Sequence, residues 1–312
     1  MSVPPQHAPR PLGRGILLAL SAYGLWGILP LFFLLLVPAN ALEIVAWRIL
    51  FSLVFCTVLL TVTRSWRRFG SLLRDRRVAL TLLIAGILIW VNWIVYVYAT
   101  VQHELVQAAL GYFINPIVTV LLGIFVLRER LRPLQWVAIG ISAIAVLVIA
   151  IGYGAFPWIS LALAFSFGLY GLIKKRVGAR VDAVSGLTME TLWLAPVAIA
   201  QLVFVGMTSG LTIGNVSPLQ TVAMLLAGVV TAVPLLLFAG AARILPLTVI
   251  GLTQYVTPLL QFLIGVVFLN EPMPLPRLIG FVLVWAALGV LTLDMFRTAR
   301  ANRPSTAESV SA

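Results

Sequence analysis

The chain carries one apolar sequence pattern twice. Residues 79–129 align without a gap onto residues 221–271, each position matching the one 142 residues later. Each copy holds five apolar segments, and because five is odd the second copy has to cross a membrane in the opposite sense to the first. The sequence therefore predicts an all-α integral membrane protein made of two inverted five-helix repeats. The aligned pairs include Gly86 and Gly228, Pro116 and Pro258, and Glu129 and Glu271.

Ten segments are apolar and long enough, or nearly so, to cross about 30 Å of hydrocarbon at about 1.5 Å per residue. The chain is 62% hydrophobic and 10% charged, whereas soluble domains average about 25% charged residues, so most of its surface is expected to face lipid. The predicted transmembrane helices are 15–37, 41–62, 78–99, 105–127, 134–151, 157–173, 183–205, 219–241, 246–269 and 277–296.

Two repeats and two tails make up the predicted domain organisation. We expect the first repeat at 14–152 and the second at 153–296, with five transmembrane helices each. The tails 1–13 and 297–312 are polar or rich in Pro, Ser and Ala, a composition typical of disorder. The first segment lacks a small-residue cleavage site, which favours a retained helix over a signal peptide.

The net charge of +12 follows the predicted topology. With the N-terminus in the cytoplasm, all of the 21 Lys and Arg residues except Arg48 and Arg277 fall in cytoplasmic loops and tails. Positive residues beside membrane helices favour the cytoplasmic side, so both termini are predicted there. This distribution argues against a nucleic-acid partner.

No set of residues with the spacing of a known catalytic site is present. The sequence has no phosphate-binding Gly-rich loop with a Lys, and its two histidines, His7 and His103, have no metal-ligand spacing. The lone Cys56 excludes an intrachain disulfide. We therefore expect a protein that is not an enzyme and that uses no metal and no cofactor.

The fourth and ninth segments carry matching polar stripes. Tyr112, Asn115 and Thr119 share one helix face. Their mates in the second copy are Gln254, Thr257 and Gln261. Polar side chains in a membrane face the bundle interior or a wet cavity, although bonding between helices is an alternative role. The candidate solute ligands from these stripes are Tyr112, Asn115, Gln254 and Thr257.

Prolines and aromatic residues accompany the stripes. Because proline removes a backbone donor and loosens the preceding turn, kinks that shape the cavity are predicted at Pro116, Pro234 and Pro258. Hinge motion at these positions stays open. Several aromatic residues lie deeper than the interfacial belt and offer stacking faces for a solute, with core packing as the alternative. The candidates are Trp26, Trp93 and Tyr170 as walls and Asn92 beside them.

Two ionisable residues lie inside predicted helices. Arg48 and Glu190 are repeat mates and both are expected near the middle of the membrane. An unpaired charge is costly there, so we expect them to pair or to face the cavity, with Glu190 as the candidate proton-coupling group. A fixed ion pair that locks the two copies is one alternative. Glu43 as the partner of Arg48 is another, although five residues is a poor helical spacing.

Several strings carry a resemblance to a known family. They are Leu-Gly-Tyr-Phe-Ile-Asn-Pro at 110–116, Leu-Ala-Phe-Ser-Phe-Gly-Leu-Tyr-Gly-Leu-Ile-Lys-Lys at 163–175, Ser-Gly-Leu-Thr-Met-Glu-Thr-Leu-Trp-Leu-Ala-Pro at 185–196, Val-Pro-Leu-Leu at 233–236, Asn92-Trp93, and Gln254-Tyr255 before Pro258. Over nearly all of residues 14–296 the chain resembles the RarD-type permeases of the EamA repeat family, within the drug/metabolite transporter superfamily.

The resemblance implies ten helices in two EamA repeats, a cell inner membrane location in a bacterium with both termini inside, and export of small organic molecules. The chain departs from the family pattern at three positions. Gln107 and Ala109 stand where relatives usually have Glu and Ser, and Trp47 stands where they tend to have His. If the family Glu carries protons, Gln107 cannot do so.

We therefore predict a secondary active transporter that exports drugs or metabolites, amino-acid-like and phenicol-like solutes included, by alternating access. The alternatives are an uncoupled facilitator or exchanger, a membrane enzyme, and a packing or sensor protein that transports nothing. The expected partners are a small-molecule solute and the lipid bilayer. Proton coupling and homo-oligomer formation stay open.

Overall fold

The computed structural model describes residues 12–101, 105–153 and 158–264, and from the last predicted segment residues 275, 278–279, 282–283, 285–287, 289–290 and 293–294. These residues form helices and turns, without a strand among them. Several predictions concern residues or side chains outside this set. They are residues 1–11 of the N-terminal tail, the C-terminal tail, His103, Gln107, Ala109, Glu271 and Arg277. The last two residues predicted for the N-terminal tail, Leu12 and Gly13, are the start of α1 instead.

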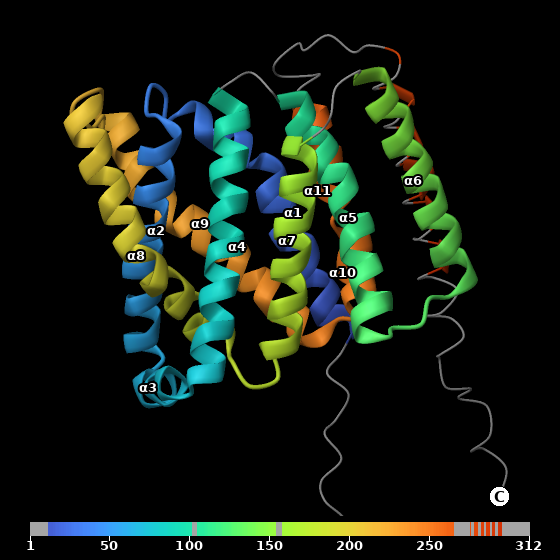
Figure 1. The fold of residues 1–312 in the computed structure, drawn as a ribbon, viewed down its shortest axis with the longest axis horizontal. Helices are drawn as coiled ribbons and strands as arrows, with labels where there is room; N and C mark the ends of the chain where they lie inside the picture. Colours follow the sequence, from blue (N-terminus) through green and yellow to red (C-terminus); the bar gives the residue numbers. More distant parts are fainter. Residues whose placement is uncertain are drawn as a thin grey trace, which may run out of the picture. The chain divides into compact units, whose positions relative to one another are not determined.

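The helices fall into two compact units. Unit 1 spans Met1–Glu129 and Phe156–Pro272, and unit 2 spans Arg130–Ala155 and Met273–Ala312. Unit 1 contains α1 (Leu12–Leu34), α2 (Ala41–Val62), α3 (Trp66–Arg74), α4 (Arg76–Val101), α5 (Leu105–Leu127), α7 (Trp158–Val177), α8 (Ala183–Thr208), α9 (Pro218–Ile244), α10 (Leu247–Thr253) and α11 (Val256–Leu263) (Figure 1). Unit 2 contains α6 (Pro133–Tyr153) and an ion pair between Arg132 Nη2 and Asp294 Oδ2 at 2.8 Å.

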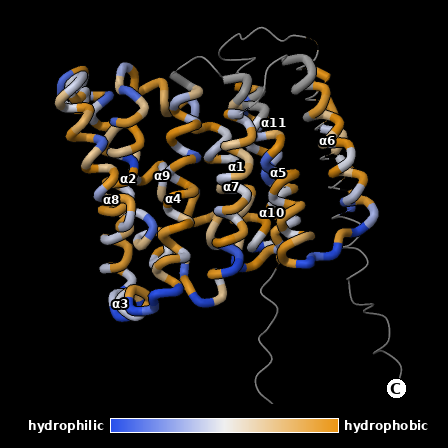
Figure 2. The backbone as a smooth tube through the Cα atoms, in the orientation of Figure 1, coloured by the Kyte–Doolittle hydropathy of each residue, from blue (hydrophilic) through white to orange (hydrophobic). Residues whose placement is uncertain are grey.

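The described helices have the surface of a membrane protein. Those long and apolar enough to cross a membrane are α1, α2, Arg76–Ala99 of α4, α8 and α9. Hydrophobic residues cover the helix shafts, while hydrophilic residues gather at α3 and at the C-terminal end of α7 (Figure 2). On α8, Phe204 is 57% and Met207 82% exposed, which suits contact with lipid rather than water. The described residues are therefore helical or in turns, with helices that suit a membrane, and the ten crossings and inverted repeats remain predictions.

Within unit 1, helices from the two sequence copies pack mainly against each other. α2 contacts α8 and α9, α4 contacts α7 and α8, and α5 contacts α7 and α10. Small residues permit this close approach. A Cβ built on Gly228 of α9 would overlap the backbone of Phe51 in α2, and beside it Ser52 Oγ donates to the Gly228 carbonyl oxygen at 3.0 Å. The core of unit 1 is thus shared between the copies.

The ninth predicted segment, 246–269, is not one continuous helix, so that expectation is wrong within its described part. α10 ends at Thr253, Gln254 and Tyr255 form a turn, and α11 begins at Val256. Pro258 has no N–H to give to the Gln254 carbonyl, which accepts instead from Thr257 N at 3.1 Å.

The other two predicted kink positions lie in continuous helices. α5 runs unbroken through Pro116, and α9 runs unbroken through Pro234. The short helix α3 has no counterpart among the predicted segments, because it is too short to cross a membrane.

Candidate functional site

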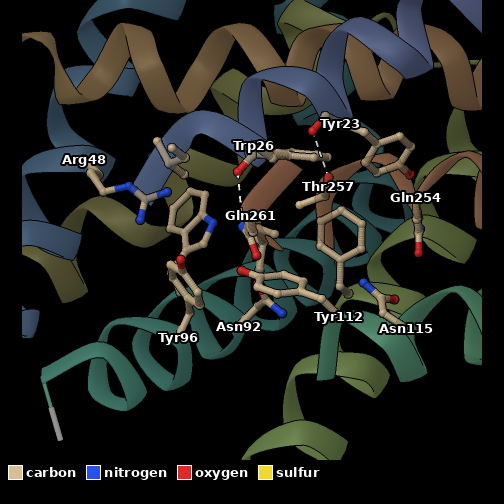
Figure 3. Close-up of a pocket in the computed structure, with 14 residues that line it drawn as sticks. Tyr23, Trp26, Arg48, Asn92, Tyr96, Tyr112, Asn115, Gln254, Thr257 and Gln261 are labelled. Carbon is tan, nitrogen blue, oxygen red and sulfur yellow. Dashed lines mark hydrogen bonds between the residues drawn. The ribbon is translucent and has the colours of Figure 1, made fainter. Parts of the chain in front are cut away.

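A pocket lies inside unit 1 between helices of both sequence copies. Its cavity volume is about 60 Å³, smaller than the volumes of about 300–1,000 Å³ of sites that hold drug-sized ligands. Figure 3 shows the side chains converging on it from helices far apart in the sequence. The lining residues are Tyr23, Trp26, Leu29, Arg48, Ile89, Asn92, Trp93, Tyr96, Tyr112, Asn115, Phe167, Gln254, Thr257 and Gln261.

All of the predicted solute ligands except Tyr170 line this pocket. Arg48 also lines it, whereas Glu190 does not. Sequence reasoning missed Tyr23 and Phe167, although a signal was present. They are matching first residues of the strings Tyr-Gly-Leu-Trp-Gly and Phe-Gly-Leu-Tyr-Gly, one in each copy. The match identifies paired positions but does not say which way the rings point.

The two polar stripes meet at one end of the pocket. Gln254 Nε2 donates to Thr119 Oγ1 at 3.3 Å, and Thr119 Oγ1 donates to Asn115 Oδ1 at 3.3 Å. Thr257 Oγ1 donates to the Tyr23 carbonyl oxygen at 2.8 Å. The stripes therefore line the cavity and also bond across helices, so the two roles considered for them coexist.

Aromatic rings form the middle of the pocket wall. The ring centroid of Trp26 lies 5.3 Å from that of Phe167 and 5.8 Å from that of Phe238. The rings of Tyr96 and Tyr112 meet edge to face at 5.6 Å, a favoured aromatic geometry. Behind this wall Tyr170 stacks on Phe238 at 5.9 Å. Tyr170 therefore supports the wall rather than lining the cavity.

Arg48 lies in the pocket away from Asn115 and Gln254 (Figure 3). Its side chain is buried, and its Nε donates to Thr231 Oγ1 at 2.9 Å. Its guanidinium carbon lies 4.9 Å from the ring centroid of Trp93 and 5.2 Å from that of Phe33. These distances are those of cation–π contacts. The pocket thus has a cationic end and an amide end.

Glu190 pairs with Lys174 and not with Arg48, which corrects the predicted charge pair. Lys174 Nζ donates to Glu190 Oε1 at 2.6 Å, and the Tyr170 hydroxyl donates to Oε2 at 3.1 Å. All three side chains are buried. Both charged partners belong to the second copy, so the pair does not lock the copies together. Sequence reasoning missed Lys174 because it adjoins Lys175 and Arg176 in a basic run that marks topology.

Glu43 is not the partner of Arg48 either. Its carboxylate accepts from the backbone N–H groups of Thr212 and Ile213 at 2.8 and 3.2 Å, and from the Thr212 hydroxyl at 3.1 Å. Glu43 therefore fixes the loop between α8 and α9. No cluster of three or more His, Cys, Asp or Glu that could hold a metal ion occurs in the part of the chain that the structure describes.

The C-terminal end of α5 is tied to the start of α10 in the other copy. The two carboxylate oxygens of Glu129 accept from the backbone N–H groups of Leu247 and Thr248 at 2.8 and 2.9 Å. A negative group is favoured at a helix N-terminus, where backbone donors lack partners. Glu129 is therefore a helix cap that joins the two copies.

Comparison with known proteins assigns the family. Residues 13–151 match the EamA-like transporter family. Protein RarD of Streptomyces exfoliatus is 45% identical over 290 residues, covering 93% of this chain and 91% of that protein. The chain belongs to the RarD family of EamA-like transporters. Another relative, the uncharacterized transporter YojE of Bacillus subtilis (strain 168), is 40% identical over 301 residues, which cover 96% of this chain and 99% of that protein.

The RarD fold is shared with a solved crystal structure of another protein. That structure aligns with a TM-score of 0.66 over 89% of this chain and 98% of its own chain, at 19% sequence identity. The likeness concerns the fold alone. The pocket described above lies in a RarD-type permease.

Proposed function

We propose that this RarD-family protein is a secondary active transporter that exports small organic molecules across the bacterial inner membrane. The observation that carries the proposal is the pocket lined by residues of both sequence copies. A solute bound there contacts both copies. Rocking of one repeat against the other would expose such a site to each side of the membrane in turn. The proposal includes ten crossings with both termini in the cytoplasm.

The proposal assigns proton coupling to Glu190. Its carboxylate is buried with Lys174 and Tyr170, and the Tyr170 ring stacks on Phe238. Phe238 in turn packs on Trp26 of the pocket wall. Protonation would leave the buried Lys174 ammonium without its counter-ion, which is strongly unfavourable. The resulting repacking of the aromatic wall would link the proton to the pocket.

Everted membrane vesicles test coupled export. A proton gradient is imposed and followed with a pH-sensitive dye while amino acids, phenicols and other small metabolites are added one at a time. We expect one class of compound to collapse the gradient only when the protein is present. Counterflow without any collapse would identify an uncoupled facilitator. Absence of both, for every compound, would contradict transport.

Two substitutions test the pocket itself. Asn115→Ala and Gln254→Ala each remove one amide from the amide end of the lining and put no larger side chain in its place. We expect each to lower the transport rate about tenfold or more. The substitution removes a hydrogen-bond partner of the bound solute and leaves a polar group of the solute buried and unpaired. Membrane insertion should not change. Asn215→Ala, in the exposed loop before α9, is the matched control. Unchanged transport by both pocket variants would refute this site.

A further inference from the structure

Arg48 is the only formally charged residue among the described residues that line the pocket. No carboxylate in the described part of the chain forms an ion pair with it, since the ion pairs there involve Arg68, Arg132 and Lys174. The nearest acidic residue in its own helix, Glu43, is bound to the loop between α8 and α9. A buried charge in a membrane is costly when it lacks a counter-ion. A bound anion would supply one.

The contacts of Arg48 leave one guanidinium donor without a partner among the described residues. Nε is occupied by Thr231 Oγ1 at 2.9 Å, and aromatic rings of Trp93 and Phe33 lie close to the guanidinium. Nη1 is buried and has no hydrogen-bond partner among the described residues. Guanidinium N–H groups lie in one plane and match the two oxygens of a carboxylate. The free donor therefore fits an acid group in the pocket.

The rest of the lining limits what the acid group is attached to. Trp26, Tyr112 and Phe167 present flat apolar surfaces, and the amide end offers neutral hydrogen-bonding groups. The described lining contains no carboxylate that could receive an ammonium group. One guanidinium also balances only one negative charge.

We propose that the solute is a net-anionic monocarboxylate with a flat apolar body, whose carboxylate binds Arg48. This inference rests on the proposed function, because it names the substrate class of the same pocket. Zwitterionic amino acids and neutral drugs are expected to be poorer ligands, since the first bring an unmatched ammonium group and the second leave Arg48 without a counter-ion.

A set of compounds with one carbon skeleton tests this class. The purified full-length protein in lipid nanodiscs is titrated with 3-phenylpropanoate, 3-phenylpropanamide, 3-phenylpropylamine and phenylalanine, and heats of binding are measured. We expect 3-phenylpropanoate to bind about tenfold or more tightly than the amide, the ratio for one charge-assisted hydrogen bond. Equal or tighter binding of any other member would overturn the proposal, and so would failure of all four to bind.

Variants of Arg48 assign the effect to this residue. Arg48→Gln should abolish the preference for the acid over the amide, and Arg48→Lys, which keeps the charge but not the planar fork, should retain part of it. Asn215→Ala should keep the full preference. A full preference in correctly folded Arg48→Gln would overturn the proposal. If Arg48→Gln does not fold, the proposal is still tested by the relative binding of the acid and the amide in the wild type and in Arg48→Lys.

Counterflow in proteoliposomes separates this inference from the proposed function. Binding of 3-phenylpropanoate without counterflow would support the acid site and contradict transport. Counterflow of a neutral solute that Arg48→Gln does not slow would support transport and overturn the acid site. We expect counterflow of 3-phenylpropanoate that is lost in Arg48→Gln.

Discussion

At the scale of single residues, Lys174 and Glu190 form a matched pair of buried charges, whereas the buried Arg48 has no counter-ion among the described residues. Lys174 and Glu190 neutralise each other at 2.6 Å. Arg48 donates a hydrogen bond to Thr231 and contacts two aromatic rings. In a buried pair the attraction roughly offsets the cost of leaving water, whereas one isolated member is strongly destabilising. The matched charges therefore add little net stability while both are present, and Arg48 remains available to a ligand.

Removing one member of the matched pair tests this view. Lys174→Met should destabilise the protein by about 3–5 kcal/mol, because Glu190 is left buried without a counter-ion. The double variant Lys174→Met, Glu190→Leu should recover most of that loss. Unfolding in detergent micelles, followed by circular dichroism, gives the free energies.

A surface pair supplies the control. Arg68→Ala breaks the ion pair with Asp182, in which the Arg68 side chain is 53% exposed, and should change stability by no more than about 1 kcal/mol. A Lys174→Met protein as stable as the wild type would show that the buried pair contributes nothing.

At the scale of helices, the contact between α2 and α9 depends on the absence of a side chain. Gly228 lies against the backbone of Phe51, and Ser52 bonds to its carbonyl oxygen. Its repeat mate Gly86 lies less tightly against the backbone of Glu190 in α8, where an added Cβ would come 3.3 Å from the Glu190 carbonyl oxygen. Close contact between copies is therefore encoded by paired glycines rather than by large apolar side chains.

Adding one methyl group tests the α2–α9 contact. Gly228→Ala should destabilise the protein by about 1–3 kcal/mol, because overpacking forces the two backbones apart. Gly24→Ala is the matched control, since a Cβ there meets nothing within 4 Å; it should be neutral or slightly stabilising because Ala favours helices. Thermal unfolding midpoints in detergent compare the two. Equal midpoints would contradict the close contact.

At the scale of the whole molecule, the helices and the pocket composition were predictable, but side-chain partners were not. Hydrophobic run length placed α2 at 41–62 and α5 at 105–127. Polar side chains such as that of Asn115 avoid contact with lipid and face the interior of the helix bundle. Their convergence on one pocket was therefore predictable. Trp26 and Tyr170 are matched in the two copies, yet only Trp26 lines the pocket, because the Tyr170 hydroxyl binds Glu190. Such differences depend on partners across helices, which one sequence does not reveal.

The predicted topology can be tested with single cysteines in a Cys56→Ser background. Ser71→Cys, on the exposed face of α3, should react with a membrane-impermeant maleimide only from the cytoplasmic side. Val216→Cys, in the exposed loop before α9, should react only from the outside. These sides follow from the positive-inside distribution. The buried Cys56 of the wild type should stay unlabelled. Labelling of both positions from one side would contradict the predicted order of crossings.

The Lys174–Glu190 pair also bears on how the chain is made. The two residues lie in α7 and α8, which follow one another with only residues 178–182 between them. A nascent hairpin of these helices can enter the bilayer with this buried pair of charges already neutralised, before α9 is synthesised. Arg48 in α2 bonds to Thr231 of α9, far downstream. The start of the second copy can thus fold during synthesis. The first copy, in contrast, keeps Arg48 without its partner Thr231 until α9 has been made, so its folding is completed by the second copy.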